Sequence, residues 1–148
     1  MEIHPDWKEF IGLLNAHGVD YVVIGAHALA FHAIPRATAD IDFLIDRRQE
    51  NADRLRKALQ AFGFTLSDEE SAKLQIPDQI LQLGVAPYRI DVFTSIHGVN
   101  NSDVFLRRVR GSLGGIDPVW FISREDLIAA KRGAGRAKDL ADLETLED

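Results

Sequence analysis

The sequence predicts an α/β (α+β) fold in which helices flank a mixed, mostly antiparallel sheet. Helical and strand-like hydrophobic patterns alternate along the 148 residues, and the composition, 46% hydrophobic and 27% charged, is typical of a globular chain. Turn residues at 77–78 and 86–87 separate strands that are linked too closely for the crossovers that parallel pairing needs. The length suits one domain, so we expect residues 1–148 to form a single domain.

The first half of the chain alternates helices with strands. Asp6 and Glu9 have the spacing of a capping box, and apolar residues recur at helical spacing until Gly18, which indicates a first helix. Residues 20–25 are apolar and β-branched and end in glycine, as in a short buried strand. The same patterns predict a helix near 26–33, a strand at 40–45 and a helix at 48–62.

The second half is predicted to begin with short strands and to end in helices. Strands are expected near 63–66, 73–76, 80–85 and 88–94, followed by a short helix at 101–108 and a hairpin at 110–122. Ser123 and Asp126 have the spacing of a second capping box, which predicts a helix to about Arg132. Gly133 and Gly135 should end it, and a last helix follows.

Three aspartates carry most of the chemical information. Asp40 and Asp42 lie in the predicted strand 40–45, where residues two apart share a face. Asp91 lies in the predicted strand 88–94. A carboxylate inside a strand needs a partner because its desolvation costs free energy, and a divalent cation is one such partner. If the two strands are neighbours, the three carboxylates can converge on one or two Mg²⁺ ions, which prefer oxygen ligands.

The segment before the first two aspartates is suited to binding phosphate. Gly25, Ala26 and His27 join the apolar strand to the next predicted helix, so free N–H groups at the helix N-terminus can bind a phosphate. Glycine also allows a close backbone approach. Arg36 could hold a phosphate in its guanidinium fork, and Thr38 could form a hydrogen bond near the metal.

Each of these side chains also has a simpler structural role. Gly25 could serve only a tight turn, and His27 could face a phosphate or simply pack. Arg36 could pair with Asp46 on the surface. Lys131 could reach a triphosphate from the end of its helix, or it could be a solvated lysine that the helix dipole stabilises.

The order of these features resembles the nucleotidyltransferase superfamily. In that family an apolar strand ends in glycine followed by glycine or serine, and an Asp-x-Asp pair and a third carboxylate follow on later strands. Here residues 27–39 separate Gly25-Ala26 from Asp40-Ile-Asp42. The longer pattern is similar to small bacterial nucleotidyltransferase-like proteins related to abortive-infection and toxin–antitoxin systems.

The resemblance implies a nucleotidyltransferase-like fold and a Mg²⁺-dependent reaction. An NMP would move from an NTP to an acceptor hydroxyl, with release of pyrophosphate. ATP is the expected NTP. The implied residues are Asp40, Asp42 and Asp91 for catalysis and for two Mg²⁺ (or Mn²⁺) ions, and Gly25, Ala26, His27, Arg36, Thr38 and Lys131 for the nucleotide. The acceptor stays open between a protein, a tRNA and a small molecule. A second copy of the chain or a partner toxin or antitoxin chain could complete its binding site.

Two other functions stay open, and one departure from the family pattern favours the first of them. Ala26 stands where the family has glycine or serine, so a serine contact to phosphate is absent. The chain could therefore be a weakly active or noncatalytic regulatory protein that acts through a partner. The chain could also be a metal-dependent phosphohydrolase in which the same carboxylates activate a water molecule.

Charge and composition narrow the function further. The net charge of −6 argues against broad nonspecific binding to nucleic acid. The absence of cysteine excludes disulfides, thiolate chemistry and cysteine zinc sites, and it suits the cytoplasm, where we expect the protein. The start of the chain lacks a signal-peptide pattern, and the longest apolar stretch, 21–34, is too short to span a bilayer, so no membrane role is expected.

Overall fold

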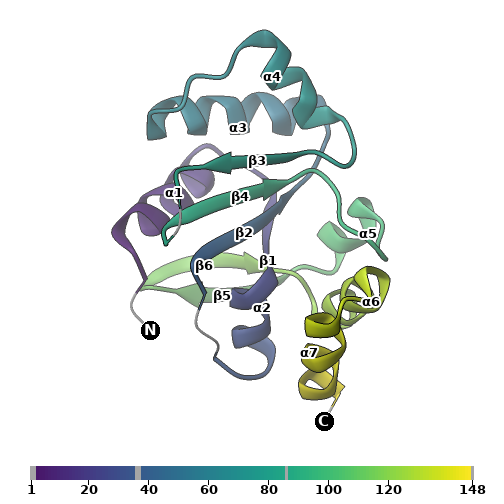
Figure 1. Ribbon diagram of the computed structural model, residues 1–148. Helices are drawn as coiled ribbons and strands as arrows, with labels where there is room; N and C mark the ends of the chain where they lie inside the picture. The colour runs from purple at the N-terminus through teal and green to yellow at the C-terminus, as the bar shows by residue number, and fades with distance from the viewer. Residues whose placement is uncertain (1–2, 36–37, 86, 148) are drawn as a thin grey trace.

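The computed structural model describes residues 3–35, 38–85 and 87–147, and within them six strands form one sheet in the order β3-β4-β2-β1-β6-β5 (Figure 1). The strands are β1 Tyr21–Ile24, β2 Asp40–Ile45, β3 Ile80–Leu83, β4 Arg89–Phe93, β5 Val109–Leu113 and β6 Ile116–Phe121. The helices are α1 Pro5–Ala16, α2 Gly25–His32, α3 Gln49–Phe62, α4 Asp68–Ala72, α5 Asn101–Leu106, α6 Arg124–Ala134 and α7 Ala137–Glu147, with a 3₁₀ turn at Lys73–Gln75.

The sheet is mixed, as predicted. The pairs β1/β2, β3/β4 and β5/β6 are antiparallel, and the pairs β1/β6 and β2/β4 are parallel. The strands joined by short connections pair antiparallel, which confirms the argument from connection length. The pairing of β2 with β4 joins strands separated by α3 and α4, and it is this pairing that brings distant polar residues together.

Helices cover both faces of the sheet. The helices α1 and α3 pack on one face, and α2, α5, α6 and α7 contribute to the core on the other (Figure 1). Along β2, Ile41 and Phe43 are fully buried in the first core, whereas Leu44 is buried in the second. Because side chains alternate along a strand, Asp40 and Asp42 share the face of Leu44, on the side of α2.

Two of the predicted strands are wrong. Residues 63–66 have no regular structure, and 73–76 contains the 3₁₀ turn. Gly63 has a left-handed backbone (φ 105°) that ends α3. The Ser67 hydroxyl then accepts a hydrogen bond from the Glu70 N–H, and the Glu70 carboxylate accepts one from the Ser67 N–H, both at 3.0 Å. This capping box starts α4, so the segment folds into helical turns.

The capping box predicted for the first helix is also wrong. The helix begins at Pro5, whose fixed φ suits the first position, and His4 Nδ1 accepts a hydrogen bond from the Asp6 N–H at 3.1 Å. The N-cap predicted for the sixth helix is confirmed, since the Ser123 hydroxyl accepts from the Asp126 N–H at 3.1 Å. That helix ends at Gly135, which has a left-handed backbone as expected, but Gly133, which was also expected to end it, lies within the helix.

A buried asparagine joins α3 to the ends of β1 and β2. The side chain of Asn51 is fully buried, and its Oδ1 accepts a hydrogen bond from the Asp20 N–H at 2.6 Å. Its Nδ2 donates to the carbonyls of Asp20 and Asp46 at 2.9 and 2.8 Å. Asp20 precedes β1 and Asp46 follows β2, so one side chain holds the two strands that carry the site in a fixed relation.

Replacing this asparagine should destabilise the fold. Asn51→Ala removes three buried hydrogen bonds, although the Asp20 carbonyl keeps its bond from the Asp46 N–H, so we expect the free energy of unfolding to fall by about 3 kcal/mol. Urea unfolding followed by circular dichroism measures this. Lys57→Ala, an exposed position on the same helix, is the control and should change stability by less than about 0.5 kcal/mol. Equal stability of the two variants would contradict the structural role of Asn51.

Candidate functional site

The parallel pairing of β2 with β4 brings the three predicted aspartates together. Asp42 lies directly opposite Asp91, and Asp40 lies two residues earlier on the same face. One carboxylate oxygen of each residue lies within 4.8 Å of the others. Asp91 is buried, whereas Asp40 and Asp42 are half-buried. The convergence expected from the sequence is therefore present.

Asp42 is the member of the triad with a strongly perturbed acidity. Burial, together with the charges of Asp40 and Asp91, raises the pKa of Asp42 from 3.8 to about 7, and the cations Arg89 and Lys138 oppose this rise. Within the described residues no hydrogen-bond donor contacts the Asp42 carboxylate. A divalent cation would relieve this repulsion between carboxylates.

The donor set fits a hard divalent cation. Carboxylates from adjacent strands supply oxygen ligands alone, which are the ligands that Mg²⁺ and Mn²⁺ prefer. The residues that would hold the ion are Asp40, Asp42 and Asp91.

Gly25 allows the backbone at the end of β1 to pass close to Asp42. Its φ is +68°, and a Cβ built at this position would lie 2.3 Å from Asp42 Oδ2. The close approach that the sequence suggested is therefore made to a carboxylate. Gly25 is also the first residue of α2, which has no side-chain cap, so the amides of this first turn keep the capacity to bind an anion.

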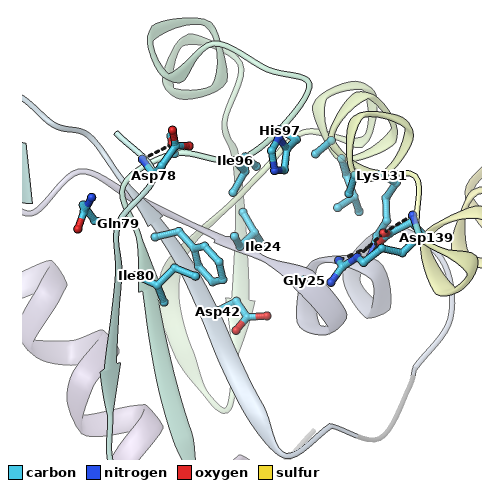
Figure 2. Close-up of a pocket in the computed structure, with 16 residues that line it drawn as sticks. Ile24, Gly25, Asp42, Asp78, Gln79, Ile80, Ile96, His97, Lys131 and Asp139 are labelled. Carbon is cyan, nitrogen blue, oxygen red and sulfur yellow. Dashed lines mark hydrogen bonds and ion pairs between the residues drawn. The ribbon is translucent and has the colours of Figure 1, made fainter. Parts of the chain in front are cut away.

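A cavity of about 450 Å³ opens beside Asp42 (Figure 2). Its lining comes from the end of β1, from β2 and β4, from the loops around β3 and β4, and from α6 and α7. Figure 2 shows Asp42 on one side of the cavity and Lys131 and Asp139 on another, with Ile24 near Asp42 and Ile96 near His97. The cavity therefore has Asp42 on one wall, the cations Lys131 and Arg136 with Asp139 on another, and apolar side chains as well.

Lys131 lines this cavity but already has anionic partners. Its Nζ lies 2.9 Å from Asp142 Oδ2 and 3.6 Å from Asp139 Oδ1, and the residue is buried. Arg136 forms a forked contact with the same Asp139 carboxylate, at 2.6 and 3.2 Å. These pairs hold α7 against α6 and place two cations at the cavity wall.

The remaining predicted nucleotide residues have different positions. The Thr38 hydroxyl donates to Asp40 Oδ1 at 3.1 Å, so it supports the triad directly. His27 is buried edge-on against Trp7, with ring centroids 5.2 Å apart, and it does not line the cavity. Burial lowers the pKa of His27, and the charge of Asp40 opposes this. Ala26 lies in the first turn of α2, and Arg36 lies outside the described residues.

Arg89 is the site residue that the sequence analysis missed. It lies opposite Asp40 in the β2/β4 register, and its guanidinium binds two of the three carboxylates. Its Nε and Nη2 donate to Asp91 at 2.9 and 3.1 Å, and Nη2 also donates to Asp40 Oδ2 at 2.9 Å. The signal was present in the segment Arg89-Ile-Asp91, because residues two apart in a strand share a face.

Replacing Gly25 should disturb the carboxylate beside it. In Gly25→Ala the new Cβ would meet Asp42 Oδ2 and the left-handed backbone would be strained, so we expect Mn²⁺ affinity to fall about tenfold or more. Calorimetric titration with Mn²⁺ measures this. Gly12→Ala, in the exposed middle of α1 with nothing near its Cβ, is the matched control and should bind Mn²⁺ as wild type does. Unchanged Mn²⁺ binding in Gly25→Ala would show that Asp42 takes no part in the metal site.

Metal binding should depend on pH through Asp42. Because its folded-state pKa is raised to about 7, the metal-free carboxyl is protonated below that pH and a cation must displace the proton. We expect Mn²⁺ to bind about tenfold more weakly at pH 6 than at pH 8. Calorimetry at pH 6 in two buffers of different ionisation enthalpy should detect release of a proton. Asp42→Asn should abolish this release, and its persistence in that variant would refute the assignment.

Two solved structures share the fold. TM1012 from Thermotoga maritima, named as a candidate nucleotidyltransferase, aligns with a TM-score of 0.62 at 18% identity, over 96% of this chain and 92% of its own. ANT(2″)-Ia, solved in complex with adenylyl-2″-tobramycin, aligns with a TM-score of 0.55 at 12% identity, over 95% of this chain and 84% of its own. At these identities the likeness establishes the nucleotidyltransferase-like fold alone.

Family membership rests on the sequence. No curated protein matches the chain. Residues 6–147 match the family described as "Nucleotidyltransferase of unknown function (DUF6036)", which agrees with the resemblance noted for the Gly25 to Asp42 segment. The match covers nearly all of the 148 residues, and the chain therefore belongs to this nucleotidyltransferase family.

Proposed function

We propose that this chain is a Mg²⁺-dependent nucleotidyltransferase that moves an NMP from an NTP to an acceptor hydroxyl and releases pyrophosphate. The observation that carries the proposal is the convergence of Asp40, Asp42 and Asp91 beside a cavity that Lys131 and Arg136 also line. The cavity has the size of a typical small-ligand site. ATP is the preferred donor in this proposal, since ANT(2″)-Ia was solved with an adenylyl product.

The aspartates have separate roles in this proposal. Asp40, Asp42 and Asp91 hold the metal, and Mg²⁺ bound there would offset phosphate charge and lower the pKa of the acceptor hydroxyl. The acceptor oxygen attacks the α-phosphorus, the bond to the leaving pyrophosphate breaks, and Asp91 accepts the hydroxyl proton. Both oxygens of Asp91 also accept hydrogen bonds from Arg89, so the guanidinium lies next to the carboxylate that would take the proton.

The triphosphate is proposed to lie between α2 and the C-terminal helices. The uncapped first turn of α2, at Gly25 and Ala26, supplies backbone N–H groups. Lys131 and Arg136 supply positive charge from the other wall after exchanging their carboxylate partners for phosphate oxygens. Positioning and charge neutralisation of this kind account for most of the rate in phosphoryl transfer.

The apolar part of the cavity is proposed to hold the nucleobase. Ile24, Phe93, Ile96 and Leu127 form an apolar surface between the two charged walls. A planar base can bury its faces against such side chains. His97 also lines this region and offers a ring nitrogen for a hydrogen bond to the base.

The acceptor and the biological setting are further parts of the proposal. A small molecule is one acceptor class, because ANT(2″)-Ia was solved with an adenylylated tobramycin; a protein hydroxyl and a tRNA end are the others. The resemblance to abortive-infection and toxin–antitoxin proteins suggests a cytoplasmic defence setting with a partner chain or a second copy. No helix among the described residues is long and apolar enough to cross a membrane.

A second candidate function is a regulatory protein of the same fold that acts through a partner. Two observations favour it. Ala26 stands where the family has glycine or serine, and the cations at the cavity wall, Lys131 and Arg136, are already paired with carboxylates. A protein of this kind would bind nucleotide weakly or not at all.

Nucleotide binding and transfer can be tested together. We expect calorimetry with the four NTPs to show Mg²⁺-dependent binding, strongest for ATP, and we expect Asp42→Asn to lower transfer from α-labelled ATP by at least about a hundredfold. Asp53→Asn, an exposed position on α3, is the control for loss of one carboxylate and should behave as wild type.

The products separate the candidate functions. Pyrophosphate with a labelled acceptor supports the transferase, whereas release of inorganic phosphate would indicate a phosphohydrolase. A folded wild-type protein that binds none of the four NTPs would refute the transferase proposal and favour the regulatory protein. Full transfer activity in Asp42→Asn would refute the assigned site.

A further inference from the structure

We infer that Arg89 is a built-in counter-ion that occupies the Asp40–Asp91 side of the triad and competes there with a second divalent cation. The inference rests on the proposed function and specifies the metal content of its site. Without nucleotide, the chain should take one divalent ion, and the second ion should bind only when a triphosphate draws the guanidinium away.

The geometry places this guanidinium where a bridging cation would act. Arg89 Nη2 lies 2.9 Å from Asp40 Oδ2 and 3.1 Å from Asp91 Oδ2, so one nitrogen joins the two carboxylates. Nε binds the other oxygen of Asp91 at 2.9 Å. Asp42 accepts no bond from this group or from any other described donor, so it is the carboxylate left for a first ion.

The charge balance also supports one divalent ion together with Arg89 in the absence of nucleotide. Three ionised carboxylates carry three negative charges, and the guanidinium cancels one. One divalent ion then neutralises the triad. A second divalent ion beside Arg89 would leave an excess of positive charge unless phosphates entered with it.

Arg89 can leave without disturbing the fold. Its backbone is fixed in β4, but its side chain is one-third exposed (33%), so rotation toward solvent opens the Asp40–Asp91 side. A phosphate offers the guanidinium a forked acceptor like the one it leaves. The exchange keeps every charge paired, which is why we link departure of Arg89 to arrival of the triphosphate.

The test is a count of bound Mn²⁺ by electron paramagnetic resonance at fixed pH. We expect one Mn²⁺ per wild-type chain without nucleotide and two with a non-hydrolysable ATP analogue. Arg89→Gln should take two Mn²⁺ without nucleotide, or bind the ion at least about tenfold more tightly, because a competing charge next to the carboxylates is gone. Mn²⁺ should also raise the Tm of Arg89→Gln more than that of wild type.

The matched control is Arg110→Gln. Arg110 pairs with Asp117 at 3.1 Å on the β5/β6 hairpin, so this variant removes the same net charge from outside the site and should bind Mn²⁺ as wild type does. If Arg89→Gln does not fold, Arg89→Lys decides the question, since lysine keeps the charge but lacks the fork that spans both carboxylates. Tighter Mn²⁺ binding than wild type supports the inference, and equal or weaker binding overturns it.

The remaining outcomes distinguish failure of the Arg89 inference from failure of the proposed transfer reaction. Weaker Mn²⁺ binding in Arg89→Gln would mean that Arg89 only positions the carboxylates, and two Mn²⁺ in nucleotide-free wild type would mean that it does not compete; either result overturns the inference. If the wild-type chain still binds only one Mn²⁺ in the presence of the ATP analogue, a triphosphate does not exchange Arg89 for a second ion, and that part of the inference is overturned. Absence of transfer with the expected Mn²⁺ counts refutes the proposed reaction and leaves the role of Arg89 supported.

Discussion

The register between β2 and β4 is the constraint on which the site depends. It sets Asp42 opposite Asp91 and Asp40 two residues away on the same face. A slip of one residue would turn Asp91 to the other face and end the cluster. The register also has a cost, since two ionised carboxylates with oxygens within 4.8 Å of each other repel by at least roughly 3 kcal/mol at an effective dielectric constant of about 20. The surrounding structure must offset this repulsion before any ligand arrives.

Each carboxylate of the triad is accommodated in a different way. Asp91 accepts the fork of Arg89, and Asp40 accepts the second Arg89 bond together with the Thr38 hydroxyl. Asp42 has no such donor among the described residues, and its pKa rises to about 7. Protonation of one carboxyl and a counter-ion for the other two bring the metal-free triad close to electrical balance. Binding of a cation therefore changes the protonation and the hydrogen bonds of the triad together.

Local patterns predicted the parts of this site that lie within single segments. Strand alternation and the distance from Gly25 identified the aspartate triad, and the short connections identified the mixed sheet. Ser67 and Glu70 carried a capping signal that was missed, so α4 was not predicted and strands were predicted on either side of it. Asn51 contacts the ends of β1 and β2 across 31 and 5 residues of sequence, and no local pattern encodes that contact. The alternation of side chains in a strand could have shown that Arg89 shares a face with Asp91. Its contact with Asp40 on β2 could not be predicted in this way, because it depends on the strand register.

The cavity wall that carries Lys131 and Arg136 follows the same principle as the triad. Lys131 and Arg136 contact the carboxylates of Asp139 and Asp142, so a ligand gains only the difference between its own contacts and those it replaces. A single phosphate can replace few of these contacts. A metal-bound triphosphate brings several anionic oxygens and can replace the partners of Lys131, Arg136 and Arg89 at once. Prior pairing of its cations should therefore make the site selective for the triphosphate over the mono- and diphosphate.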